Sequence, residues 1–95
     1  MERQYYKVQT GENCPAEKVI ASKRKCEDAL DIWQLKHHNL DVNDTARPAG
    51  CYWKSDGDGF FNNVLDPSST NRKAFGDRGG LCNVNGKNHK NILYW

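Results

Sequence analysis

The sequence predicts a small α+β domain stapled by disulfides, in which one main helix packs on a short antiparallel sheet. Three observations predict this class. The chain has 95 residues with four cysteines, residues 22–36 show helical periodicity, and residues 51–64 have the pattern of a β-hairpin. With a mean hydropathy of −0.92, a chain of this length buries only a thin apolar core. Disulfide cross-links are therefore expected to supply much of its stability.

The hairpin is the central predicted element. Two aromatic-rich segments, residues 51–54 and 60–64, flank the sequence SDGDG, whose glycines and aspartates suit a tight reversal. Pro48 and Gly50 set the direction of the chain before the first of these strands. Another strand is expected at residues 4–10, because aromatic and β-branched residues are frequent there.

The helix is predicted at residues 22–36. Ser22 is suited to be its N-cap, and four residues fall on one helical face, namely Cys26, Ala29, Leu30 and Trp33. The helix is expected to close at His37 and His38. These neighbours would point about 100° apart and so could not easily chelate one ion together. On the first strand, Tyr6 and Val8 are expected to face the covered side.

The four cysteines allow three disulfide pairings. The predicted pairing joins the helix residue Cys26 to Cys51 of the hairpin, which leaves Cys14 to pair with Cys82. A zinc site is disfavoured because neighbouring cysteines lie at least 12 residues apart, whereas compact zinc half-sites use closely spaced pairs. Paired cysteines indicate an oxidising compartment, so we expect an extracellular or secreted protein.

The remaining segments are expected to be polar and irregular. Residues 39–49 form a polar connection with the sequon Asn-Asp-Thr at Asn43, a glycosylation site if the protein is secreted by a eukaryote. Residues 65–80 are expected to form a long loop anchored by Phe75, and residues 81–84 a last strand.

We expect a single domain over residues 1–95, with a compact body at 4–84 and a C-terminal segment at 85–95. The apolar residues 92–95 are expected to pack back as an edge strand, with a binding segment as the alternative. Residues 1–10 lack the apolar stretch of a secretory signal. The chain is therefore interpreted as a mature or excised domain, standing alone or as one unit of a repeat array.

The hairpin also holds the candidate ligand contacts. Neighbouring residues of a strand face opposite sides, so one aromatic of the pair Tyr52 and Trp53 can form a stacking platform for a sugar or a peptide. The simpler alternative is that both faces are covered. The candidate ligand-binding residues are Tyr52, Trp53, Asp56, Asp58, Phe61 and Asn62. The two aspartates match part of a calcium loop, but the rest of that pattern is missing. We assign no cofactor, no metal ligand and no catalytic residue.

Charge narrows the range of partners. The net charge is +2 and the pI is near 8.4, and the basic cluster at residues 23–25 is followed at once by Glu27 and Asp28. Nucleic-acid binding needs a larger basic patch than this. No segment is apolar enough for membrane insertion. The expected partners are a carbohydrate or a cell-surface or extracellular protein.

Several short motifs together resemble a known kind of module. They are CEDAL at residues 26–30, RPAGCY at 47–52, FFN at 60–62 and GLC at 80–82. Their order resembles small four-cysteine modules that recur in secreted or surface proteins of marine protists and some invertebrates. It is more distantly similar to apple or PAN-type adhesion modules, in which a helix is disulfide-bonded to a small sheet. The resemblance covers residues 6–84 and implies an extracellular module, without a settled function.

Three classes of function follow from these observations. A non-enzymatic extracellular recognition or adhesion module is favoured, because the expected scaffold carries edge aromatics and long polar loops. The first alternative is a small secreted hydrolase, since three histidines and several carboxylates are present. The second is a secreted effector or peptide precursor whose activity lies in residues 92–95.

Overall fold

The computed structural model describes residues 4–84. In that range one α-helix and five strands form the framework, β1 (Tyr5–Lys7), α1 (Lys23–Ile32), β2 (Lys36–Val42), β3 (Gly50–Lys54), β4 (Asp58–Asn62) and β5 (Arg78–Asn83). Three short 3-10 turns complete it, η1 (Ala16–Lys18), η2 (Pro67–Ser69) and η3 (Arg72–Ala74). The predicted α+β class and its single main helix are confirmed.

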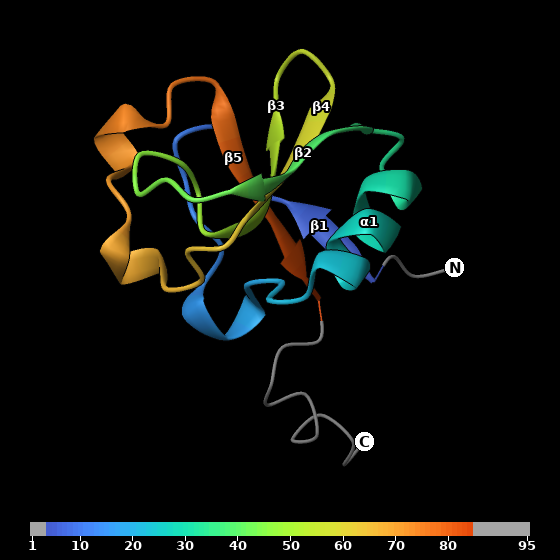
Figure 1. The fold of residues 1–95 in the computed structure, drawn as a ribbon, viewed down its shortest axis with the longest axis horizontal. Helices are drawn as coiled ribbons and strands as arrows, with labels where there is room; N and C mark the ends of the chain where they lie inside the picture. Colours follow the sequence, from blue (N-terminus) through green and yellow to red (C-terminus); the bar gives the residue numbers. More distant parts are fainter. Residues whose placement is uncertain (1–3, 85–95) are drawn as a thin grey trace.

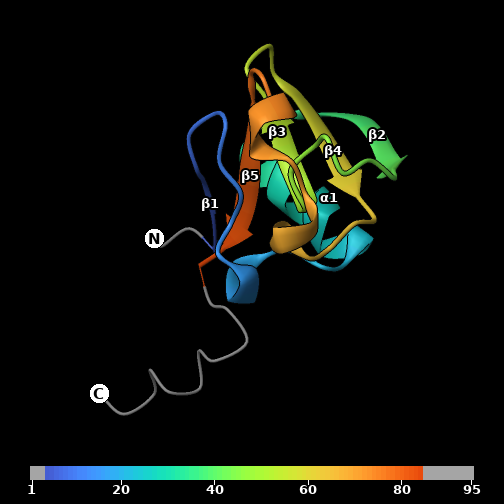
Figure 2. The ribbon, with the colours of Figure 1, turned by 90° about the vertical axis from the view of Figure 1, so that its left-hand side faces the viewer.

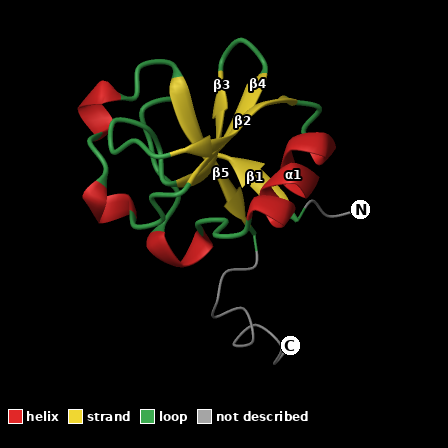
Figure 3. Cartoon of the chain, in the orientation of Figure 1, coloured by secondary structure: helices red, strands yellow, loops and turns green. Residues whose placement is uncertain are grey.

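The strands form one sheet in the order β1-β5-β3-β4-β2. The pairs β1–β5, β5–β3 and β3–β4 are antiparallel, whereas β2 runs parallel to β4. Helix α1 lies on one side of the sheet, and η2 and η3 lie on the other (Figures 1 and 3). Figure 2 shows β1 at one edge of the sheet, beside β5.

The parallel strand β2 departs from the predicted antiparallel sheet, and the helix is shorter than predicted. Gln34 has φ 58°, in the left-handed region that commonly ends a helix. Lys36 N then donates to Gly57 O in the hairpin turn, which brings the chain into the sheet. His37 and His38 therefore belong to β2 and not to a helix end. Residues 43–49 connect β2 to β3, which lies on the other side of β4 in the sheet. Strands β2 and β4 therefore run in the same direction.

Strand β1 is also shorter than predicted. The face that packs on the core is not the predicted one. Tyr5 is buried, whereas Tyr6 and Val8 are half-buried. In the β1–β5 register Tyr5 pairs with Asn83, and this places the Tyr5 ring in the cluster beneath α1. The expectation that Tyr6 and Val8 form the covered face was therefore wrong by one residue.

The core between α1 and the sheet is thin. Only three helix residues are buried, Cys26, Ala29 and Leu30. Ser22 caps the helix by accepting a hydrogen bond from Lys25 N at 3.3 Å. Leu30 lies so close over Gly59 that a methyl group at that position would overlap its side chain. The sheet therefore approaches the helix closely at this glycine.

Both predicted disulfides are present. Cys26 of α1 is bonded to Cys51 of β3, and Cys14 is bonded to Cys82 of β5. The first bond joins the helix to the centre of the sheet, and the second joins the segment after β1 to β5. No cysteine of the chain is free.

The opposite face of the sheet is covered by irregular chain. Tyr52 stacks on Phe60 with ring centroids 4.8 Å apart and planes within 7°. Over residues 63–77 the chain connects β4 to β5 without a strand, and Phe75 in this connection is fully buried. The predicted long loop anchored by Phe75 is thereby confirmed, although β5 already begins at Arg78.

Two further predictions concern the C-terminal segment and membrane insertion. The C-terminal segment 85–95, with its apolar residues 92–95, lies outside the described residues. Within residues 4–84, no helix is long and apolar enough to cross a membrane.

We predict that Gly50→Ala destabilises the fold more than Gly76→Ala. Both glycines have φ 66°, so each substitution carries the same left-handed backbone cost of about 1–2 kcal/mol. At position 50 the new Cβ would also lie 2.6 Å from Ile20 O, whereas position 76 is open. The free energy of unfolding, measured by urea titration, should fall further for the first variant. Equal losses of unfolding free energy in the two variants would show that the contact with Ile20 adds nothing to the cost of the substitution.

Candidate functional site

Three of the six predicted ligand-binding residues lie in the interior. Tyr52, Phe61 and Asn62 are 1%, 4% and 0% exposed. Tyr52 lies under the covering loops on one side of the sheet, and Phe61 packs in the cluster beneath α1 on the other. In this fold both faces of the hairpin centre are covered, and these three side chains are not surface groups for a ligand to contact.

Asn62 holds the connection between β2 and β3. Its Nδ2 donates to Asp44 O at 2.8 Å and to Pro48 O at 3.0 Å, and its Oδ1 accepts from Asp44 N at 3.2 Å and Val64 N at 3.1 Å. A buried amide with every polar atom bonded is a structural group. The sequence signal at Asn62 therefore reflects loop anchoring.

Trp53 is the predicted aromatic that remains accessible. Its ring is half-buried, as is that of Trp33 at the end of α1. The ammonium nitrogen of Lys7 lies 4.3 Å from the Trp53 ring centroid and 5.0 Å from that of Trp33. We call Lys7, Trp33 and Trp53 the tryptophan–lysine cluster. It lies on the α1 side of the sheet, at the margin of the core.

Strand β1 and the residue after it fix the orientation of both indoles. Trp33 Nε1 donates to Tyr5 O at 3.1 Å, and Trp53 Nε1 donates to Val8 O at 3.0 Å. Lys7 lies between these two acceptors and is exposed. A cation over an indole face is attracted by the ring quadrupole. The cluster therefore combines rigid aromatic rings with one ammonium group at the surface.

The two predicted aspartates lie at the hairpin turn. Asp58 N donates to Asp56 Oδ1 at 3.1 Å, and this bond lowers the pKa of Asp56 below its ordinary value, helped by Lys54 at 3.3 Å. The Asp56 carboxylate that a calcium loop would use as a ligand is therefore already bonded within the hairpin turn. Across residues 4–84, no group of three His, Cys, Asp or Glu side chains is placed to hold a metal ion.

The histidines of β2 do not form one site. His37 Nε2 pairs with Asp31 Oδ1 of α1 at 2.8 Å, whereas His38 Nδ1 lies 3.4 Å from Asp58 Oδ2 and its ring packs on Phe60. Each histidine therefore has its own carboxylate partner. The third, His89, lies outside the described residues.

The sequon residue Asn43 is exposed and directly follows β2. Its neighbour Asp44 is held by Asn62 and caps the following turn through a 2.8 Å bond from Ala46 N. The side chain of Asn43 thus lies at the surface beside an edge strand.

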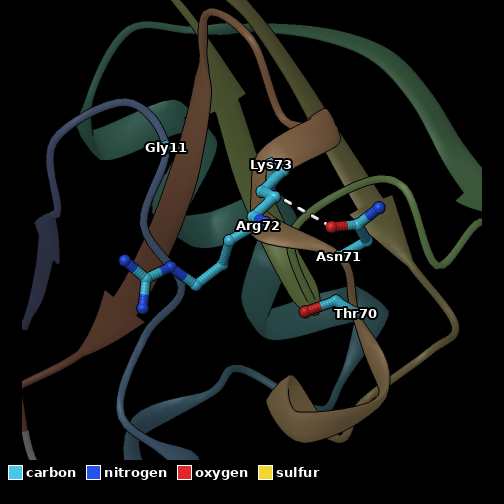
Figure 4. Close-up of a pocket in the computed structure, with 5 residues that line it drawn as sticks. All are labelled: Gly11, Thr70, Asn71, Arg72 and Lys73. Atoms are coloured by element: carbon cyan, nitrogen blue, oxygen red, sulfur yellow. Dashed lines mark hydrogen bonds between the residues drawn. The ribbon is translucent and has the colours of Figure 1, made fainter.

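A shallow, open depression lies on the η3 side of the molecule. It encloses about 440 Å³ and is lined by Gly11, Thr70, Asn71, Arg72 and Lys73, and we call it the polar basin. Figure 4 shows Arg72 extended toward the segment that holds Gly11 and the hydrogen bond between Asn71 and Lys73. Arg72 also pairs with Glu12 at 3.0 Å.

Neither surface was fully predictable from the sequence. Trp33 was predicted only to lie on the covered face of the helix, because helical periodicity does not reveal that it lies at the margin of the core. Lys7 carried no signal, because it meets the tryptophans only once β1 pairs with β5. The basin residues fell inside a predicted loop, and no local pattern indicates their approach to Gly11.

Comparison of the chain with family models, curated proteins and solved structures finds no match.

We predict that Asn62→Asp costs at least about 3 kcal/mol of stability, because the Asp44 and Pro48 carbonyls lose their donor and a carboxylate enters the interior. The matched control is Asn63→Asp, since the side chain of Asn63 is exposed and donates only to Asp41 Oδ1, at 3.1 Å. Urea denaturation of both variants measures the difference. A loss at position 62 no larger than that at position 63 would contradict the anchoring role.

Burial raises the pKa of Tyr52 to about 12, against weaker opposing effects of Arg78 and Arg47. The phenol of the unfolded chain ionises near 10. Because the folded pKa is the higher one, the folded state favours the neutral phenol, and its contribution is lost as the pH rises from about 10 to about 12. We predict that Tyr52→Phe shows a smaller loss of unfolding free energy over this range than the parent. Parallel curves for the two proteins would refute this assignment.

Proposed function

We propose that the protein is a non-enzymatic extracellular recognition module that binds a carbohydrate or protein ligand at the tryptophan–lysine cluster. The observation that carries the proposal is the fixed Trp53 ring, half-exposed, tied to Val8 O and approached by the ammonium of Lys7.

Fixed rings lower the cost of binding. When both indole N–H groups are bonded to the backbone at 3.0 and 3.1 Å, a ligand does not have to order them, so less binding energy is lost to conformational entropy. Large rigid aromatics are also enriched where proteins bind partners. The cluster thus has the properties of a preformed contact surface.

The chemistry of the cluster favours a saccharide within the two ligand classes. An indole presents an apolar face and edge to the C–H groups of a sugar ring, and a neighbouring ammonium donates hydrogen bonds to hydroxyl or carboxylate oxygens. Lys7 is exposed, so its side chain can turn from the rings toward a ligand. A protein ligand would use the same two groups.

The extracellular location rests on the disulfides. Two disulfides in a chain of 95 residues suit an oxidising compartment, where small domains rely on such cross-links. An N-glycan at Asn43 belongs to the same proposal, since that side chain is exposed beside the edge strand β2.

The hydrolase alternative has weaker support. His37 and His38 pair with different carboxylates, so the two histidines are not paired with each other as the acid and base of one hydrolytic site. The effector alternative depends on residues 92–95, which lie outside the described residues.

The test is binding of the oxidised protein to a panel of immobilised oligosaccharides and extracellular proteins, with Lys7→Ala and Trp53→Phe beside the parent. We expect Lys7→Ala to weaken binding to any hit about tenfold, because a charge-assisted hydrogen bond is lost, and Trp53→Phe to weaken it less. Lys25→Ala, an exposed lysine on α1, is the matched control.

Chemical-shift changes at the Trp53 indole N–H should accompany binding to the parent. Hits that bind all four proteins alike would refute the cluster as the contact surface. Absence of any binder, or turnover of a bound oligosaccharide, would refute the recognition function itself.

A further inference from the structure

We propose that the polar basin binds an oxyanion, a sulfate or carboxylate group, as a second site separate from the tryptophan–lysine cluster. The two places lie on opposite sides of the sheet, because Trp33 follows α1 whereas Arg72 and Lys73 belong to η3 (Figure 1). The proposal does not depend on the function proposed for the cluster.

The basin lies on a connection that is long for so small a domain. Residues 63–77 link β4 to β5 with only the short turns η2 and η3. Connections of about this length without regular structure are uncommon in compact domains and frequently form binding loops. The length of this connection is therefore one indication of function.

The connection is nevertheless pinned in place. Phe75 is fully buried, and Asn71 N donates to Thr45 O at 2.7 Å. Asn13 Nδ2 donates to Thr70 Oγ1 at 2.7 Å, while Asn13 Oδ1 accepts from Ala49 N at 2.9 Å. Hydrogen bonds to two separate parts of the chain, together with the buried Phe75 ring, hold the basin in one shape, so a ligand does not have to order the loop.

Hydrogen-bond donors dominate the basin. The Asn71 oxygen already accepts from Lys73 N at 3.2 Å, which leaves its amide nitrogen as a donor. The Thr70 hydroxyl is engaged by Asn13 and by Pro67 O at 2.7 Å. The groups left for a ligand are the Asn71 amide, the Arg72 guanidinium and the Lys73 ammonium, and all of them suit an oxygen anion.

The charge balance favours an anion as well. Within the described part of the chain Lys73 has no ion pair. Arg72 pairs with Glu12 at 3.0 Å, but both side chains are largely solvated, at 61% and 39% exposed, and such pairs are weak. One positive charge is left uncompensated, and a ligand anion competes only with Glu12.

The wall opposite η3 leaves room for the ligand. No atom lies within 4 Å of the place where a side chain at Gly11 would begin. With about 440 Å³ of open space, the basin can take a sulfate or carboxylate together with the sugar ring that carries it. The same donors would also hold a free inorganic anion.

The experiment is an amide chemical-shift titration at low ionic strength with three probes: inorganic sulfate, a sulfated disaccharide and the same disaccharide without sulfate. Chloride at matched ionic strength is the baseline, because exposed charges are screened by salt. We expect shifts at the amides of residues 70–73 with both sulfated probes and none with the desulfated one. Tighter binding of the disaccharide assigns the ligand as an acidic saccharide, and equal binding assigns a free anion.

Removing a positive charge and removing a negative charge at the basin should change its affinity for sulfate in opposite directions. Arg72→Gln and Lys73→Gln should each weaken sulfate binding about threefold, and Glu12→Gln should strengthen it by about as much, in line with the strength of exposed charge pairs. Lys25→Gln on α1 is the control for net charge, and Lys7→Ala should leave this binding unchanged.

No shift at residues 70–73 up to about 50 mM sulfate, a weaker affinity than any useful site would have, would overturn the proposal. Equal effects of Lys73→Gln and Lys25→Gln would overturn it too, because they would mean non-specific attraction to net charge. Loss of sulfate binding in Lys7→Ala would place the anion at the cluster and not at the basin.

Discussion

The Cys26–Cys51 disulfide is the constraint on which the rest of the structure depends. Helix α1 buries only three residues against the sheet, two of which are the small residues Cys26 and Ala29, so apolar contact alone holds it weakly. The disulfide closes a separation of 25 residues and the Cys14–Cys82 bond one of 68. In the loop-entropy model these closures destabilise the unfolded chain by roughly 3 to 5 kcal/mol each, a large part of the stability of a domain this size.

With α1 fixed, the hairpin divides its side chains between two covered faces. Cys51 and Phe61 join the cluster beneath α1, whereas Tyr52 stacks on Phe60 on the opposite face, where both are buried. Because the helix has only ten residues, it does not extend over the whole sheet, and Trp53 remains at the margin. The accessible indole is thus a consequence of the short helix.

The sequence predicts those parts of the fold that depend on local pattern and cysteine geometry. The hairpin, the N-cap at Ser22 and both disulfides follow from residue type and spacing. Strand β2 could not be predicted, because its exposed edge position removes the alternation that identifies a strand, and its parallel pairing with β4 is set by Gln34 and the distant Gly57. Tertiary contact decides such segments.

A residue of the candidate surfaces could be predicted only where its type and its neighbours in the sequence were enough to place it. Trp53 was found because an aromatic beside Tyr52 must face the other side of the strand. The burial of Asn62 was missed, since it depends on carbonyls of Asp44 and Pro48 that a sequence does not place near it. Lys7 was missed for the same reason, as its partners lie on α1 and β3.

One short segment connects the two surfaces. Val8 accepts the bond from Trp53, and three residues later Gly11 N donates to Arg78 O and faces the basin. Four residue steps separate Lys7 from Gly11, at most about 14 Å along an extended chain, and the path runs beside β5. The pairing of this segment with β5 therefore fixes the positions of Lys7 and Gly11 together, since Lys7 pairs with Leu81 and Gly11 with Arg78.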